Sequence, residues 1–228
     1  MTFQETTQEL REYQDVLQEY GADVVRRLRP GLTREDALHA AEKRGLFLTE
    51  DALALWMWHD GDASAESSTN SWCGDAGIVA SLSFPSLGDA LDIALKNPVL
   101  KDESRKADPE SVIDVYSLPV ATLWGEPHIS LHCTKQNPDA LKDAPVPGDT
   151  LTYYGDGYLT YFGDGYGVDS IHTIPFAQMV RSWTRYVQMG YWKVYPDGQL
   201  REDQYWGLPG HSGEQEVKDL LKKLDGEE

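Results

Sequence analysis

The sequence predicts an α+β protein, with a central antiparallel β-sheet flanked by N-terminal and C-terminal helices. Up to Leu95, apolar residues recur at three- and four-residue steps, which is the period of amphipathic helices. From Ser111 to His172 the pattern changes to short runs rich in β-branched and aromatic residues, separated by Pro, Gly and Asp turns. Helical periodicity returns after Pro175. Helices, then strands, then helices define an α+β order rather than an alternating α/β order.

Capping residues place the helices that precede the sheet. The first helix follows an apolar stripe from Leu10 to Leu28, and Gly21 marks the position at which it is expected to bend. Short polar side chains accept hydrogen bonds from the free N–H groups of a first helical turn, so they mark helix starts. Such residues begin the next three predicted helices: Thr33, Thr49 and Ser86.

Turn residues divide the rest of the chain. Strands are predicted over residues 112–117, 119–124, 128–133, 150–154, 158–162 and 166–172. After the sheet we expect a helix opened by Pro175, a hairpin turning at Asp197-Gly198 and a terminal helix capped by Ser212. The resulting organisation is an N-terminal helix over 1–30, an α+β domain over 31–210 and a C-terminal helix over 211–228.

The composition is strongly acidic. The chain of 228 residues carries 38 Asp and Glu against 20 Lys and Arg, a formal net charge of −18. A field of this sign repels phosphate backbones and anionic lipid headgroups and attracts basic proteins. The charge therefore favours a basic protein partner and argues against direct nucleic-acid or membrane binding. The alternative is that the charge serves only solubility.

Cysteine usage and the N-terminal stretch indicate a cytoplasmic protein. Cys73 and Cys133 lie sixty residues apart and neither belongs to a C-x-x-C pair, which is typical of a reducing compartment. The N-terminal stretch is polar and acidic, unlike a signal peptide. No stretch approaches the roughly eighteen apolar residues of a membrane span.

A Gly-Asp-Gly motif occurs twice and contains four of the residues that we expect to contact a partner. Asp156 and Tyr158 belong to the first copy, and Asp164 and Tyr166 to the second. Asp-Gly favours hairpin turns, so the run between the copies is predicted to be a strand with a turn at each end. Extended residues advance about 3.3 Å each, which puts the two aspartates on the order of 25 Å apart, too far to share a metal ion. The motif predicts a Tyr-rich meander with acidic tips.

No motif predicts a metal site, a cofactor or catalysis. In HISLHC, His128 and His132 share a strand face but lie about 13 Å apart, too far for one zinc ion. G-x-S-x-G, P-loop and G-x-G-x-x-G motifs do not occur in the sequence. We therefore expect a protein that is not an enzyme and needs no cofactor. A glycosidase-type pair of carboxylates stays open as an alternative, because acidic residues are plentiful.

One segment resembles a known family. LRPGLTREDALHAAEKRGLFLTEDALALWMWHDGD, from Leu28 to Asp62, is similar to the N-terminal signature of the SUKH superfamily, in which a short helix leads to an L-P step and a W-H-D-G ending. Thr49 stands where the family usually has proline, and either residue can start a helix. Residues 132–135 depart from the aspartate-rich turn of many relatives.

The resemblance implies an α+β fold around an antiparallel sheet, and binding rather than catalysis. Bacterial members of the superfamily include immunity proteins that block toxins, many of them nucleases, and fungal members regulate cell-wall synthesis. We therefore expect a non-enzymatic protein-binding module, with neutralisation of a basic toxin as its leading role. The alternatives are a regulatory adaptor for a housekeeping partner and a carbohydrate-active or glycan-binding protein.

The segment after the third predicted helix contains the remaining expected contacts. His59, Asp60 and Asp62 are predicted to lie in a loop and to contact the partner together with the acidic tips of the meander. The alternative is that His59-Asp60-Gly61 only ends the helix, because glycine is a common residue at a helix C-terminus.

Overall fold

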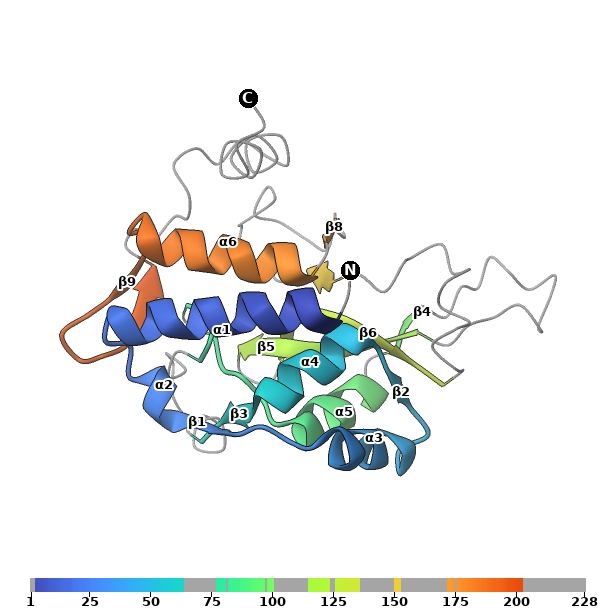
Figure 1. Ribbon diagram of the computed structural model, residues 1–228. Helices are drawn as coiled ribbons and strands as arrows, with labels where there is room; N and C mark the ends of the chain where they lie inside the picture. The colour runs from blue at the N-terminus through green and yellow to red at the C-terminus, as the bar shows by residue number, and fades with distance from the viewer. Residues whose placement is uncertain are drawn as a thin grey trace.

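The computed structural model of the chain combines helices with antiparallel strands (Figure 1). It describes residues 3–63, 77–80, 82–96, 98–100, 115–123, 126–135, 150–152, 172–174 and 176–202. Within these ranges the predicted mixture of helices and antiparallel strands is confirmed.

The helix starts follow the predicted caps. The helices in the described ranges are α1 (Phe3–Glu19), α2 (Val24–Arg27), α3 (Arg34–Glu42), α4 (Glu50–Trp58), α5 (Leu87–Lys96) and α6 (Phe176–Gln188). The side-chain oxygens of Thr33, Thr49 and Ser86 each accept a hydrogen bond from the N–H three residues ahead, at 3.1, 3.2 and 3.2 Å. The three capping predictions are therefore confirmed.

Within the described ranges, the strands pair with antiparallel neighbours. They are β1 (Leu28–Pro30), β2 (Phe47–Leu48), β3 (His59–Asp62), β4 (Pro98–Leu100), β5 (Val115–Leu123), β6 (Glu126–Thr134), β7 (Thr150–Thr152), β8 (His172–Ile174), β9 (Trp192–Val194) and β10 (Leu200–Glu202). Strands β4, β5, β6, β7 and β8 lie in this order in one sheet, and β2 also pairs with β6. β1 pairs with β3, and β9 with β10 in the predicted hairpin.

The first helix is shorter than predicted. α1 ends at Glu19, and Gly21 has a φ of 76°, a left-handed conformation that a continuing α-helix cannot contain. The chain then forms the single turn α2 and continues directly as β1. Gly21 therefore ends the helix rather than bending it, and Leu28 lies in a strand.

Strand β5 replaces two predicted strands. The sequence predicts a break near Leu118, but one strand runs through Pro119, which lies opposite Ser130 of β6. The register shifts between Pro119 and Ala121. Because proline has no N–H to donate to a ladder, it is tolerated in a strand at such an irregularity.

Aromatic side chains join the helices in the core. α1 lies between α6 and α4, and α5 packs against β5 (Figure 1). The rings of Tyr13 and Phe176 lie 5.8 and 5.9 Å from that of Trp183. The buried hydroxyl of Tyr13 donates to the carbonyl oxygen of Ile78 at 2.5 Å. Trp56 and Trp183 are 0% and 2% exposed, so both belong to the core.

Several predicted elements lie outside the described residues. These include the strand at 158–162, both Gly-Asp-Gly turns, residues 166–171 of the last predicted strand, and the C-terminal helix at 211–228. The domain boundaries therefore stay predictions. Among the helices of the described ranges, none has both the length and the apolar character needed to cross a membrane.

Candidate functional site

The predicted contact segment His59–Asp62 is a strand, β3, rather than a loop. It pairs with β1, and His59 lies opposite Pro30 while Asp62 lies opposite Leu28. The sequence predicts that the first helix runs through Leu28. It therefore does not indicate the strand β1 with which β3 pairs. The pairing fixes the positions of the His and Asp side chains, and each of them has a partner inside the protein.

His59 has an oxygen atom close to each ring nitrogen. Nδ1 lies 2.7 Å from the carbonyl oxygen of Arg29, which can only accept, so Nδ1 carries a proton. Nε2 lies 3.1 Å from Oε1 of Gln14, which accepts from the indole N–H of Trp58 at 2.7 Å, so Nε2 donates to this oxygen only when the ring is doubly protonated. Burial lowers the pKa of His59, while the hydrogen bond to Arg29 opposes this shift. The imidazole links α1, β1 and the end of α4.

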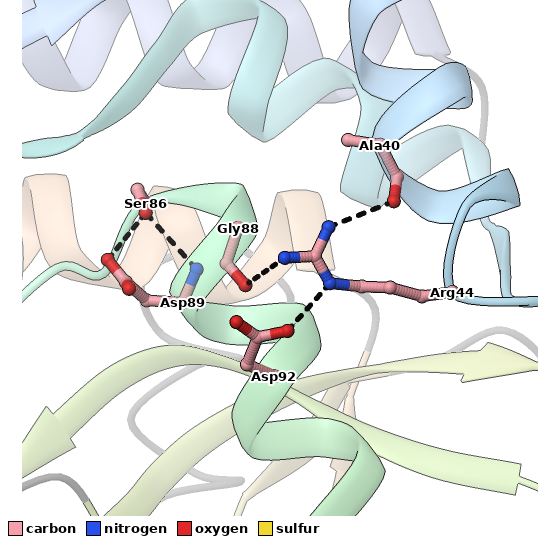
Figure 2. Close-up of polar contacts among 6 residues, drawn as sticks. All are labelled: Ala40, Arg44, Ser86, Gly88, Asp89 and Asp92. Atoms are coloured by element: carbon pink, nitrogen blue, oxygen red, sulfur yellow. Dashed lines mark hydrogen bonds and ion pairs between the residues drawn. The ribbon is translucent and has the colours of Figure 1, made fainter.

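Asp60 caps helix α5. Its Oδ1 accepts a hydrogen bond from the N–H of Leu87 at 2.8 Å. In the same turn, Ser86 Oγ accepts from the N–H of Asp89, a contact that Figure 2 shows at the start of α5. The carboxylate of Asp60 thus lies at the positive end of the helix dipole, where a negative charge is stabilising. The sequence indicates Ser86 as the cap, whereas the structure shows that Asp60 shares this role.

Asp62 is buried in an ion pair with Arg27. The Asp62 side chain is 1% exposed, and its carboxylate oxygens lie 3.2 Å from Nη2 and 3.3 Å from Nε of Arg27. Gly61, between the two aspartates, has a φ of 81°, and a Cβ atom there would lie 2.6 Å from the backbone nitrogen of Ser86. Only glycine fits this position, because β3 packs directly on the start of α5.

The contacts of β3 stabilise the fold. His59, Asp60 and Asp62 lie in one strand. The side chain of His59 contacts α1 and β1, that of Asp60 contacts α5, and that of Asp62 contacts α2. Contact between these residues and a partner stays a prediction. The other expected contact residues lie outside the described residues: Asp156, Tyr158, Asp164 and Tyr166.

Arg44 joins the end of α3 to α5, a role that the sequence does not indicate (Figure 2). Its Nε donates to Asp92 at 2.7 Å, and its Nη1 and Nη2 donate to the carbonyl oxygens of Ala40 at 3.2 Å and Gly88 at 3.4 Å. The hydrogen bond from Arg44 holds the pKa of Asp92 below its usual value. The pair spans 48 residues of chain, so no local spacing rule could have matched the two side chains.

An acidic stripe lies on the solvent face of α1. It consists of four exposed carboxylates at seven-, three- and four-residue steps: Glu5, Glu12, Asp15 and Glu19. The buried face of α1 packs against α4 and α6, and Glu9 is paired with Arg181 of α6 at 2.6 Å. The sequence shows this stripe as the complement of the apolar one, although it was not among the expected contacts.

The described part of the chain contains no cluster of metal ligands and no reactive thiol. No group of three or more His, Cys, Asp and Glu side chains there could hold a metal ion. Cys133 is fully buried, and burial raises the pKa of its thiol to about 12. A thiol with so high a pKa is not a nucleophile at neutral pH.

No protein-family model and no curated protein matches the chain. The resemblance to the SUKH superfamily rests on the residues of the segment from Leu28 to Asp62.

Proposed function

We propose that this protein is a non-enzymatic binding module that holds a basic protein partner on the acidic stripe of α1. The observation that carries the proposal is the position of four exposed carboxylates on one helix face of a chain with a net charge of −18. From Glu5 to Glu19 the stripe spans about 21 Å, at about 1.5 Å per helical residue. Carboxylates gathered on one face steer a cationic partner toward that face.

The packing of α1 supports this use of its solvent-exposed face. α4 and α6 cover its buried side, and the Glu9–Arg181 ion pair joins it to α6. A helix held in this way loses little conformational freedom when a partner binds, so less of the interaction energy is offset by ordering.

The resemblance defines the form of the function that we propose. We infer a SUKH-like fold with a central antiparallel sheet flanked by helices, a cytoplasmic location, and a role as an immunity protein that neutralises a basic toxin. The W-H-D-G segment supports the fold assignment, because its residues have specific packing roles: Trp58 on Gln14, His59 on β1, Asp60 on α5 and Gly61 against Ser86.

A binding measurement with matched charge variants tests the proposal. The partner is the product of a toxin-like gene beside the gene of this protein, and titration calorimetry measures the Kd. Glu12→Gln/Glu19→Gln removes two charges from the acidic stripe, and Glu35→Gln/Glu42→Gln removes two exposed charges from α3. We expect the first variant to raise the Kd about tenfold, mainly through slower association, and the second to change it by less than about twofold.

Equal losses in the two variants would show that net charge, and not the acidic stripe, drives binding. If no toxin-like gene lies nearby, the immunity role is contradicted. The adaptor role then predicts that the unaltered chain captures a basic host protein and that the stripe variant does not.

A further inference from the structure

A recess of about 460 Å³ lies where the turn after α1 meets the β9–β10 hairpin. The hairpin lies beside the C-terminal end of α1 (Figure 1). It is lined by Tyr20, Gly21, Asp23 and residues 194–198. The N–H of Asp23 donates to the carbonyl oxygen of Gly198 at 2.8 Å, which joins the two turns. The recess is therefore built from two segments that are far apart in the chain and are held together by the backbone.

The lining carries negative charge and aromatic surface. Tyr20 is 45% exposed, and the Asp23 and Asp197 side chains are 39% and 50% exposed, so all three are accessible from solvent. Tyr195 adds a second aromatic ring, and none of the lining residues is basic. Two carboxylates with two tyrosine rings suit a cation, since both groups attract positive charge.

The two carboxylates are held in place by the hairpin. A Cβ atom on Gly198, whose φ is 79°, would overlap the carboxylate of Asp23, so this carboxylate packs directly on the glycine. Asp197 accepts a hydrogen bond from the N–H of Gln199 at 3.1 Å, and this bond, with that from Arg201, holds its pKa below the usual value. The Asp23 carboxylate is thus positioned before a ligand arrives, while Asp197 is paired with Arg201.

The hairpin itself already binds one guanidinium group. The Arg201 guanidinium lies 5.4 Å from the centre of the Tyr195 ring and 2.6 Å from the carboxylate of Asp197. Asp23, in contrast, pairs with Arg26 at 3.3 Å, and the Arg26 side chain is 84% exposed. Such an exposed pair contributes little free energy, so another cation can replace Arg26.

We propose that this recess binds a Lys or Arg side chain of the basic partner, with the cation between the Tyr20 ring and the Asp23 carboxylate. The inference rests on the proposed function and deepens it. The acidic stripe ends at Glu19, and the next residue of the chain, Tyr20, lines the recess. The stripe attracts the partner, and the recess selects a side chain that has a cation at its tip.

The experiment is an NMR titration of ¹⁵N-labelled protein with a hexa-arginine peptide, repeated with the neutral oligosaccharide maltohexaose. We expect the peptide to shift the amide signals of Gly21, Asp23 and Gly198 with one common Kd. Tyr20→Ala and the isosteric Asp23→Asn should each raise that Kd about three- to tenfold, as expected for the loss of one cation–π or charge contact. A spectrum like that of the unaltered protein shows that each variant is folded.

Two outcomes would overturn the inference. In the first, the peptide shifts only the amide signals of the Glu12–Glu19 part of α1, and neither variant changes the Kd. The acidic stripe would then be the binding surface, and the recess would not bind the cation. Shifts of the recess signals by maltohexaose but not by the peptide would assign the recess to glycans. The first result leaves the proposed function intact, because that function is tested separately through the stripe variants and the toxin-like partner.

Discussion

The carboxylate of Asp60 accepts a hydrogen bond from the backbone N–H of Leu87 at 2.8 Å, although 27 residues separate the two in the chain. A residue expected to contact a partner is therefore the cap of a distant helix. We predict that Asp60→Ala lowers the free energy of unfolding by about 1 kcal/mol, the usual effect of losing an N-terminal cap. Asp60→Asn keeps an oxygen that can accept this hydrogen bond, so its free energy of unfolding should stay near that of the unaltered protein. Urea denaturation measures both, and equal stability of Asp60→Ala would contradict the capping role.

The Arg27–Asp62 pair should contribute more than an exposed pair. Asp62 is 1% exposed, so Asp62→Asn removes the negative charge of a buried ion pair, and we expect a loss of about 2 to 4 kcal/mol. In the Arg34–Glu50 pair both side chains are about half exposed, and Glu50→Gln should cost less than about 1 kcal/mol. The two midpoints of denaturation, measured side by side, give the comparison. Similar losses of stability in the two variants would show that the burial of Asp62 does not strengthen its ion pair.

Two glycines with positive φ should differ in their tolerance of alanine. At Gly45, with a φ of 66°, an added Cβ meets nothing within 4 Å, so Gly45→Ala should cost about 1 to 2 kcal/mol, from the left-handed backbone alone. At Gly61 the added Cβ would also lie 2.6 Å from the nitrogen of Ser86, and relieving such an overlap costs about 1 to 3 kcal/mol more. Thermal unfolding of the two variants tests this order. A more stable Gly61→Ala would mean that β3 does not pack on α5 as described.

His59 should make stability depend on pH below about 6.5, the ordinary value of an unfolded histidine. Because burial lowers the pKa of His59, the folded protein binds fewer protons there than the unfolded chain. The stability from a neutral His59 is fully present above about 6.5 and is lost as pH falls toward and through the lowered pKa. The difference in unfolding free energy between the unaltered protein and His59→Asn, measured from pH 7.5 to 5, should shrink with falling pH. A constant difference would contradict the shift.

Gln14 offers an independent check on the same imidazole. Since Gln14 Oε1 lies 3.1 Å from Nε2 of His59, Gln14→Glu places a negative charge beside the ring and should raise its pKa. Gln18→Glu adds the same charge on the exposed face of α1 and should raise it far less. An NMR titration of the His59 ring proton measures both variants. Equal shifts would show a general charge effect and no direct contact.

Cys133 should be inert to thiol reagents while the protein is folded. Its side chain is 0% exposed and burial raises its pKa to about 12, so neither access nor thiolate is available at neutral pH. In a Cys73→Ser variant, Cys133 is the remaining thiol. We expect labelling with a disulfide reagent only after urea unfolds the chain, and rapid labelling of the folded variant would contradict the burial of β6.

Local features of the fold could be predicted from the sequence. The caps at Thr33, Thr49 and Ser86 were found because each acceptor and its N–H donor lie within one helical turn. The β9–β10 hairpin was found because Asp197-Gly198 allows the tight turn that brings its strands together. The apolar stripes of α1 and α6 indicate the buried faces of these helices. A helix face can be predicted because it depends on the spacing of residues within one segment.

Tertiary structure decided where those segments meet. The sequence predicts a loop at His59–Asp62, and the segment is a strand because it pairs with β1. Gly21 ends α1, which leaves Leu28 free to pair with Asp62. Charge and aromatic character are the features that indicate the seven candidate residues. The three that the structure describes, His59, Asp60 and Asp62, contact partners inside the protein. The sequence alone determined the helix caps, the turns and the acidic character of the chain. The partners of Asp60 and Asp62 are set by the packing of segments 27 and 35 residues away, because long-range contacts depend on which surfaces bury each other and not on local spacing.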